Sequence, residues 1–283
     1  MSAPNSANIN PNGSANKRAM RFLAAFFSGA AAAVIVTYVH KRLARLLWRL
    51  NLPPKHLLLA DRRRDFCSAQ SISYANTDPL LIVSGSGAYL TDEAGRSFLD
   101  TRNNVCHVGH AHPAVAAAVS AQVEQLNTNT RYLHPNVCAL ARRLLDTMPP
   151  PLRDGVVFFV NSGSEANDLA IRLARAANKK GSQRTLVVDH AYHGHTVSVI
   201  GLSPYKFEHK SFGGNGKPPW VTKLKAPDTY RGPYRGADAA SKYAEEVAKA
   251  CVAAKDEGGV CAFFIESGMS VAGALARSKL WAL

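Results

Sequence analysis

Residues 156–168 read VVFFVNSGSEAND and combine the two patterns that decide the fold. The apolar run from Val156 to Val160 is typical of a strand that is buried on both faces of a parallel sheet. A turn of small and polar residues follows, and it leads into a helical pattern over residues 168–177. A buried strand, a short turn and a helix in this order predict one βα unit of an α/β protein.

The same alternation continues on both sides of this unit. Apolar runs predict strands over residues 185–188 and 260–265, and helical spacing predicts a helix over residues 241–254. Residues 203–236 are rich in Pro, Gly, Lys and Tyr, and we expect a long loop there. On the N-terminal side a β-hairpin is expected at residues 88–100. The sequence therefore predicts an α/β fold with a mainly parallel sheet.

Two further helices are expected between the hairpin and the central strand. A proline opens each of them at the favoured first position, and they cover residues 113–126 and 135–148. The first helix has Val115, Val119, Val123 and Leu126 on one face. We expect the second helix to bury Val137, Leu140 and Leu144.

The turn after the central strand has the composition of a phosphate site. A helix N-terminus presents unpaired backbone N–H groups and the positive end of the helix dipole, and Gly163 lets an anion approach the backbone without a Cβ in the way. A simpler interpretation also fits, because Ser162 and Glu165 have the spacing of a capping box. The spacing alone leaves both interpretations open.

A second polar motif, residues 189–195, follows the strand at 185–188. Ligands of open α/β sheets bind at the carboxyl ends of parallel strands, where this motif lies. Tyr192 could cover a flat heterocycle there, or it could be a half-buried packing residue.

Together the two motifs, Ser-Gly-Ser-Glu-Ala-Asn followed by Tyr-His-Gly, resemble the class III aminotransferase family. The resemblance covers residues 65–272 and is greatest for the branch of alanine–glyoxylate aminotransferase-like proteins and ethanolamine-phosphate phospho-lyases. Other stretches that match the family are the hairpin at 89–100, the histidine-containing loop at 103–113, residues 130–134 and residues 203–207.

The resemblance implies pyridoxal phosphate as the cofactor and a fold-type I large domain, preceded by an N-terminal segment of the small domain. Gly163 and Ser164 would donate backbone N–H groups to the cofactor phosphate, Tyr192 would stack on its ring, and His193 would lie beside it. Glu266 matches an active-site glutamate, although Ser267 stands where many members have proline. The resemblance also implies a small-molecule amine or amino-acid substrate and a homodimer.

The family's Schiff-base lysine and pyridinium acid are not found in this sequence. Lys279 is the only lysine after Glu266, in surroundings unlike the Schiff-base site, and Lys206 matches a different family position. We therefore expect a C-terminally truncated and inactive chain. The full-length relative would transfer an amino group or eliminate phosphate from a phospho-amine. The alternative function is that of a non-catalytic, membrane-tethered fragment that binds or competes with a complete subunit.

Two His-x-x-His-x-His sets, at residues 107–112 and 190–195, raise the alternative of a metal hydrolase. Neither set has a carboxylate or cysteine at close range to complete a site, and the resemblance already accounts for both. We predict no metal.

Residues 22–39 are uncharged and apolar with basic flanks, which predicts a membrane anchor with the body facing the cytosol. A mitochondrial import signal is the main alternative, because residues 1–60 hold eight Lys/Arg and no Asp/Glu. A secretory signal or a buried helix is a third possibility.

The whole chain has a formal charge of +14, but residues 61–283 carry 26 basic against 20 acidic residues and no basic run interleaved with aromatics. We therefore expect no nucleic-acid partner. The five cysteines are scattered without a CxxC pair, as expected for free thiols.

These patterns predict a division of the chain into five regions. They are disordered residues 1–16, an anchor or targeting helix at 17–60, an N-terminal segment of the aminotransferase fold at 61–130, a partial cofactor-binding large domain at 131–273 and a divergent tail at 274–283.

Overall fold

The computed structural model describes residues 13–65, 78–103, 107–128, 131–209, 216–271 and 273, and for residues 13–28 and 30 it describes the backbone alone. Residues 1–12, most of the predicted disordered segment, and the predicted tail at 274–283 lie outside the described residues. The chain divides into two compact units, Met1–Tyr132 and Leu133–Leu283.

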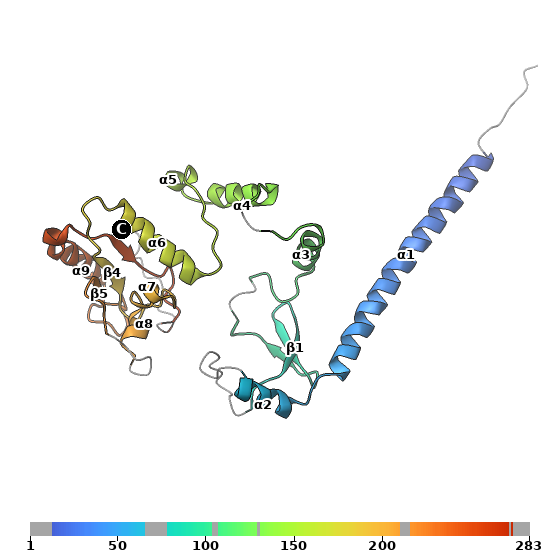
Figure 1. The fold of residues 1–283 in the computed structure, drawn as a ribbon, viewed down its shortest axis with the longest axis horizontal. Helices are drawn as coiled ribbons and strands as arrows, with labels where there is room; N and C mark the ends of the chain where they lie inside the picture. Colours follow the sequence, from blue (N-terminus) through green and yellow to red (C-terminus); the bar gives the residue numbers. More distant parts are fainter. Residues whose placement is uncertain are drawn as a thin grey trace, which may run out of the picture. The chain divides into compact units, whose positions relative to one another are not determined.

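The first unit contains two leading helices, an antiparallel sheet and a further helix (Figure 1). Its elements are α1 (Gly13–Leu50), α2 (Lys55–Asp65), β1 (Ile82–Ser86), β2 (Tyr89–Asp92), β3 (Ser97–Leu99) and α3 (Pro113–Gln125). The sheet has the order β1-β2-β3, with Leu90 opposite Phe98 across the predicted hairpin, which is confirmed. Its turn is closed by the buried carboxylate of Asp92, which accepts hydrogen bonds from the Arg96 backbone N–H (2.8 Å) and Nε (2.7 Å).

A second buried carboxylate holds the chain that leaves the hairpin. Asp100 accepts hydrogen bonds from the Arg102 and Asn103 backbone N–H groups and from Asn103 Nδ2, and its Oδ2 lies 2.6 Å from His110 Nε2. These bonds, above all those from Asn103, lower the pKa of Asp100. Gly87 and His110 also exchange two backbone hydrogen bonds of 2.8 and 3.1 Å. The loop that matches the family's histidine motif is therefore tied back onto the hairpin.

The second unit contains a small parallel sheet of order β5-β4-β6, and helices α6 to α9 lie near it, whereas α4 and α5 stand apart from it (Figure 1). Its elements are α4 (Pro135–Asp146), α5 (Pro150–Arg153), α6 (Gly163–Ala177), β4 (Thr185–Val188), α7 (Val197–Ile200), α8 (Pro204–Phe207), β5 (Val221–Leu224), α9 (Ala239–Ala253), a 3₁₀ turn (Lys255–Glu257) and β6 (Ala262–Phe264). All four residues of the central strand β4 are buried. The predicted α/β class with a parallel sheet is confirmed.

Two small apolar clusters hold the sheet to its surrounding segments. Val187 of β4 packs with Leu202 and Val221, and Trp220 and Phe264 lean against them. The second cluster lies where the strands end and consists of Val188, Ala191 and Met269, with Ala226 and Ile265 at its margin. Buried apolar side chains thus pack against the carboxyl ends of β4 and β6 and hold them in place.

The prediction of a central strand at residues 156–160 is wrong, because the structure has no strand there. The segment is not paired with any described strand, and Val156 and Phe158 are 81% and 58% exposed. The residues have the apolar character of a buried strand. A strand also needs a neighbouring strand for its backbone hydrogen bonds, and no described strand lies beside residues 156–160. Conversely, β5 lies within residues 203–236, where only a loop was expected.

The apolar face of α4 is exposed, contrary to expectation, and that of α3 is exposed as well. Val119 of α3 is 56% exposed and Leu140 of α4 is 49% exposed, and the other residues of both predicted faces range from 36% to 60%. Both helices exist with nearly the expected bounds. Their amphipathic pattern is therefore correct, but the described part of the chain supplies no surface to cover it.

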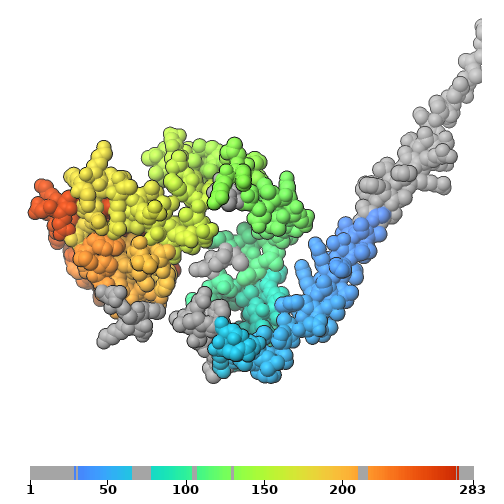
Figure 2. All heavy atoms as spheres, in the orientation of Figure 1, coloured from blue at the N-terminus to red at the C-terminus, as the bar shows by residue number. Residues whose placement is uncertain are grey.

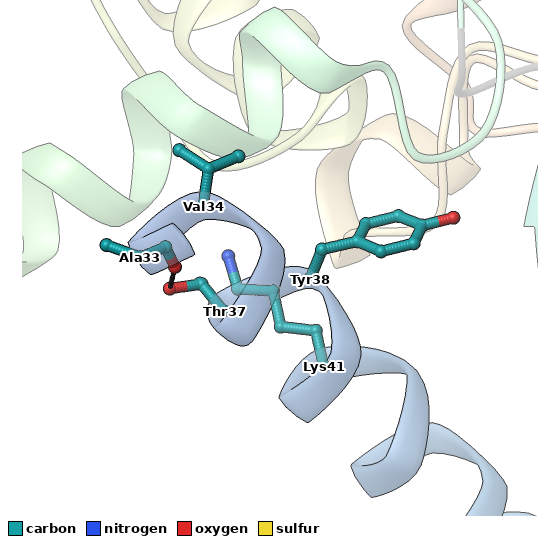
Figure 3. A pocket seen from close by; sticks show the side chains of 5 residues that line it. All are labelled: Ala33, Val34, Thr37, Tyr38 and Lys41. Atoms are coloured by element: carbon teal, nitrogen blue, oxygen red, sulfur yellow. Dashed lines mark hydrogen bonds between the residues drawn. The ribbon is translucent and has the colours of Figure 1, made fainter. Parts of the chain in front are cut away.

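The predicted membrane anchor at residues 22–39 falls within α1, and the structure does not support it. Among the described residues no helix is long and apolar enough to cross a membrane. The side chains of residues 22–28 and 30 lie outside the described part of the chain. In the described part, cationic residues recur from Lys41 onward, next to the short apolar stretch that contains Val34 and Tyr38 (Figure 3).

Core and exposed valines should differ sharply in their contribution to stability. Val187→Ala removes two buried methyl groups beside Leu202 and Val221, so we expect it to lower the free energy of unfolding by about 2 kcal/mol. The matched control Val156→Ala, at an exposed position, should change it by less than about 0.5 kcal/mol. Urea unfolding of the full chain measures both. An equal loss in the two variants would mean that Val156 is covered in solution.

Candidate functional site

The candidate site lies in the second unit, where the N-terminus of α6 meets the turn that follows β4. Ser162 is the N-cap of α6, and its Oγ accepts a hydrogen bond from the Glu165 backbone N–H at 3.1 Å. The Glu165 carboxylate in turn accepts from the Asn161 backbone N–H (2.7 Å) and Nδ2 (3.0 Å). The capping interpretation of this motif is therefore correct as far as Ser162 and Glu165 are concerned.

Capping by these two residues leaves the first residues of α6 available to a ligand. The first N–H groups of an α-helix have no acceptor within the helix, and Gly163 and Ser164 occupy these positions. Gly163 is exposed, and a Cβ built on it would meet no atom within 4 Å. An anion can thus reach the backbone at Gly163 from open space.

Hydrogen bonds join the turn after β4 directly to α6. Ser164 Oγ accepts from the His195 backbone N–H at 3.1 Å, and Asn167 Nδ2 donates to the His193 carbonyl at 2.7 Å. Gly194 lies between them with a φ of +138°, and a Cβ there would approach Ser164 Oγ to 2.7 Å. Only glycine fits this close contact. The two motifs that carry the family resemblance are therefore held together as one structural element.

His193 is buried under this turn. Its backbone N–H donates to Ser203 Oγ (2.9 Å), and its ring packs edge-on against Phe264 with the centroids 5.8 Å apart. Burial lowers the pKa of His193 to about 4, so the imidazole is neutral near pH 7. Its Nε2 is buried and has no hydrogen-bond partner among the described residues.

Tyr192 and Glu266 connect the ends of β4 and β6. The Tyr192 backbone N–H donates to Glu266 Oε1 at 3.1 Å, whereas Glu266 Oε2 is buried without a partner in the described part of the chain. Burial raises the pKa of the Glu266 carboxyl. The half-buried Tyr192 ring lies 6.3 Å from that of Tyr205, edge to face, and Lys206 Nζ is 5.8 Å from its centroid.

All five residues singled out from the sequence belong to this site. Gly163 and Ser164 begin α6, Tyr192 and His193 form the turn joined to it, and Glu266 binds that turn. Two polar side chains that position the turn, Asn167 and Ser203, were not predicted from the sequence. Each lies inside a motif that was noticed, but a single Asn or Ser carries no sequence signal for a hydrogen bond to a residue 26 or 10 positions away.

In the two histidine motifs, His110 and His190 lie beside aspartate carboxylates rather than in a cluster that could bind a metal ion. His110 pairs with Asp100, as described above, and His190 Nδ1 lies 3.7 Å from Asp189. Within the described residues, no three His, Cys, Asp or Glu side chains gather closely enough to hold a metal ion. Lys279, the lysine nearest to the C-terminus, lies outside the described residues.

Known proteins share these features over most of the chain. The Drosophila melanogaster protein "alanine–glyoxylate aminotransferase 2-like" is 46% identical over 206 residues, which are 71% of this chain and 40% of that protein. The Caenorhabditis elegans "ethanolamine-phosphate phospho-lyase homolog 1" is 36% identical over 230 residues, 77% of this chain and 48% of the relative. Some other matching relatives are described as mitochondrial. The chain thus spans less than half the length of the curated relatives it matches.

A solved structure agrees with these relatives. A phospholyase from Arthrobacter in complex with phosphoethanolamine superimposes with a TM-score of 0.61 at 36% sequence identity, over 73% of this chain and 47% of that one. Transaminases of lower identity share the same fold, with TM-scores up to 0.69. Residues 72–282 match the family described as aminotransferase class III, whose members use pyridoxal phosphate. This match covers well over half of the sequence, and the chain therefore belongs to the class III aminotransferases.

Proposed function

We propose that this chain carries the phosphate-binding and ring-binding half of a pyridoxal phosphate site. The observation that carries the proposal is the hydrogen-bonded junction between α6 and the turn after β4, which leaves Gly163 open to an anion. A helix N-terminus of this kind stabilises a phosphate through its N–H groups and its dipole. The residues present fit the cofactor at its phosphate and at one face of its ring.

Each residue then has a defined task. The backbone N–H groups of Gly163 and Ser164 bind the phosphate, and the Tyr192 ring covers one face of the pyridine ring. Neutral His193 and Glu266 contribute two of the three buried side-chain polar atoms that have no partner among the described residues; the third is Arg175 Nε. Such atoms are costly unless a ligand or a further polar group reaches them. When bound, the cofactor supplies an electron sink for chemistry at the carbon next to an amine.

We further propose a small primary amine or amino acid as the substrate of the complete protein. The relatives named as aminotransferases and as phospho-lyases point to two reaction classes, amino-group transfer and elimination of phosphate from a phospho-amine. Both begin at the same cofactor, so the residues of this half serve either reaction. For the residues of this half we propose binding of the cofactor without a covalent lysine link, because neither Lys206 nor Lys279 has surroundings that resemble the family's Schiff-base site.

A second candidate function is that of a non-catalytic partner that binds a complete subunit. The exposed apolar residues of α4 and of the unpaired segment 156–160 favour it, because apolar surface of this extent is normally covered by another part of the protein or by a partner. In a homodimeric family, a second subunit is the natural partner, and the fragment would compete with a complete chain.

Blocking the open space at Gly163 should abolish binding of the cofactor. Gly163→Val places two methyl groups where the phosphate would approach, while no protein atom lies within 4 Å of the new Cβ. We expect titration of the full chain with pyridoxal phosphate, followed by tyrosine and tryptophan fluorescence, to show saturable quenching that this variant loses. Gly29→Val, at a second position with open space, is the matched control and should bind normally. Equal binding by both variants would refute the phosphate site.

Bound cofactor should remain exchangeable. After incubation with pyridoxal phosphate and reduction with borohydride, we expect peptide mass analysis to find no single lysine that carries the cofactor stoichiometrically, and dialysis should remove the absorbance. Lys206 is the lysine to inspect first, because its Nζ lies 5.8 Å from the Tyr192 ring. Stoichiometric labelling of one lysine, lost in the matching Lys→Met variant, would contradict non-covalent binding.

The buried neutral state of His193 should make stability depend on pH. Its folded-state pKa of about 4 lies below the ordinary value of 6.5, so the unfolded chain takes up a proton first as the pH falls. Stability is then fully present above about pH 6.5 and declines toward pH 4, by up to about 3 kcal/mol. Urea unfolding across this range should show a smaller decline for His193→Gln than for the control His195→Gln, whose imidazole is exposed. Identical slopes would place His193 in contact with water.

A further inference from the structure

The C-terminal part of α1 has an apolar face and an adjoining cationic face, and the proposed function uses neither of them. From residue 39 to residue 50 the apolar side chains recur at helical spacing and share one face; they are Val39, Leu43, Leu46, Leu47 and Leu50. They are between 50% and 72% exposed. In the space-filling view this stretch, coloured blue, borders open space along its length (Figure 2). An apolar face of this kind is stable only when something covers it.

The adjoining face of the same helix is cationic. Lys41, Arg42, Arg45 and Arg49 follow one another at intervals of one to four residues, and the chain contains no acidic residue before Asp61. The guanidinium group of Arg42 lies over the Tyr38 ring, 5.2 Å from its centroid. Lys41 runs back along the helix past Thr37, whose hydroxyl donates to the Ala33 carbonyl at 2.8 Å (Figure 3). Long basic side chains can thus lie along the helix while their charged ends stay in water.

A groove of about 740 Å³ runs between this part of α1 and strand β1 of the same unit. Its walls are Val39, Arg42, Leu43, Arg45, Leu46, Trp48 and Arg49 from the helix and residues 83–86 from the strand. Arg49 Nη2 donates to Ser84 Oγ at 2.8 Å, so one guanidinium is already fixed at the edge of the groove. The groove therefore combines three guanidinium groups with apolar side chains and has no acidic residue in its walls.

We propose that this cationic groove, residues 39–50 of α1 with residues 83–86, binds an anionic phospholipid surface. The arginines would bind lipid phosphates, for which their planar donors are well suited, and the apolar face of Val39, Leu43, Leu46, Leu47 and Leu50 would enter the boundary between headgroups and acyl chains. Charge complementarity selects this occupant over a neutral apolar partner. Four basic residues within about three helical turns require the helix to lie along the surface, because each would be costly inside the hydrocarbon layer.

The groove arginines should control binding to acidic vesicles. We expect the full chain to float with vesicles of phosphatidylcholine and phosphatidylglycerol, to bind phosphatidylcholine alone far more weakly, and to be released by high salt. Arg42→Gln/Arg45→Gln/Arg49→Gln should weaken binding to the acidic vesicles about a hundredfold, since each basic residue near such a surface contributes roughly fivefold. The matched control Lys179→Gln/Lys180→Gln/Lys249→Gln, at exposed positions of the second unit, loses the same charge and should bind nearly as well.

A depth measurement tests the orientation independently of the charge. A tryptophan placed on the apolar face by Leu47→Trp, in a Trp48→Phe background, should be quenched more strongly by acyl chains brominated near the headgroup than by chains brominated near the methyl end. The Trp48→Phe parent should show much less quenching. Three results would overturn the proposal: equal losses in the two triple variants, full binding by the groove variant, or a bound chain that resists alkaline carbonate. Binding of inorganic phosphate or glycerophosphate that competes with vesicles at millimolar concentration would assign the groove to a soluble anion instead.

Discussion

The structure of the site depends on the close contact between Ser164 at the start of α6 and the turn containing Gly194. Two hydrogen bonds, His195 N–H to Ser164 Oγ and Asn167 Nδ2 to the His193 carbonyl, connect segments that are about thirty residues apart. The contact requires a glycine with positive φ, because a Cβ at Gly194 would overlap Ser164. It holds the N-terminus of α6 and the turn that contains Tyr192 in one rigid arrangement. Such preorganisation reduces the ordering cost of binding.

The same frame explains why the buried polar atoms of the site lie where they do. The His193 backbone N–H donates a hydrogen bond to Ser203 Oγ, and the His193 ring packs against Phe264 of β6. Glu266 follows that strand and accepts the Tyr192 backbone N–H. The atoms His193 Nε2 and Glu266 Oε2 are buried and have no hydrogen-bond partner among the described residues. Burial favours the neutral form of both groups. A neutral imidazole can donate or accept, depending on its tautomer, and so can serve a polar group of either kind.

Predictions from the sequence were correct for local features. They failed where the structure depends on pairing between segments that are distant in the sequence. The hairpin with its Asp92 turn and the strand β4 were found because their patterns are complete within a few residues. Strand β5 was missed, since its four residues hold only two apolar side chains within a Pro- and Gly-rich region. Four of the site residues lie in the two motifs, and Glu266 was found by its separate match to the family. By contrast, Asn167 and Ser203 act through bonds that span 26 and 10 residues. Residues 156–160 show the opposite error, because an apolar run predicts burial but does not supply the partner.

The segment of residues 156–160, which has no strand partner among the described residues, leads directly into the proposed phosphate site. It is followed by Asn161, whose backbone N–H is held by Glu165, and the next two residues begin α6. On its C-terminal side the site is anchored by the turn after β4 and by the buried Ile171 of α6. On its N-terminal side it continues from backbone that has no strand partner in the described part of the chain, and capping by Ser162 and Glu165 holds the first turn. Any surface that covers Val156 to Val160 would therefore also stiffen the first turn of α6. Completing the sheet and binding the phosphate are thus expected to favour each other, because whichever comes first removes part of the ordering cost of the other.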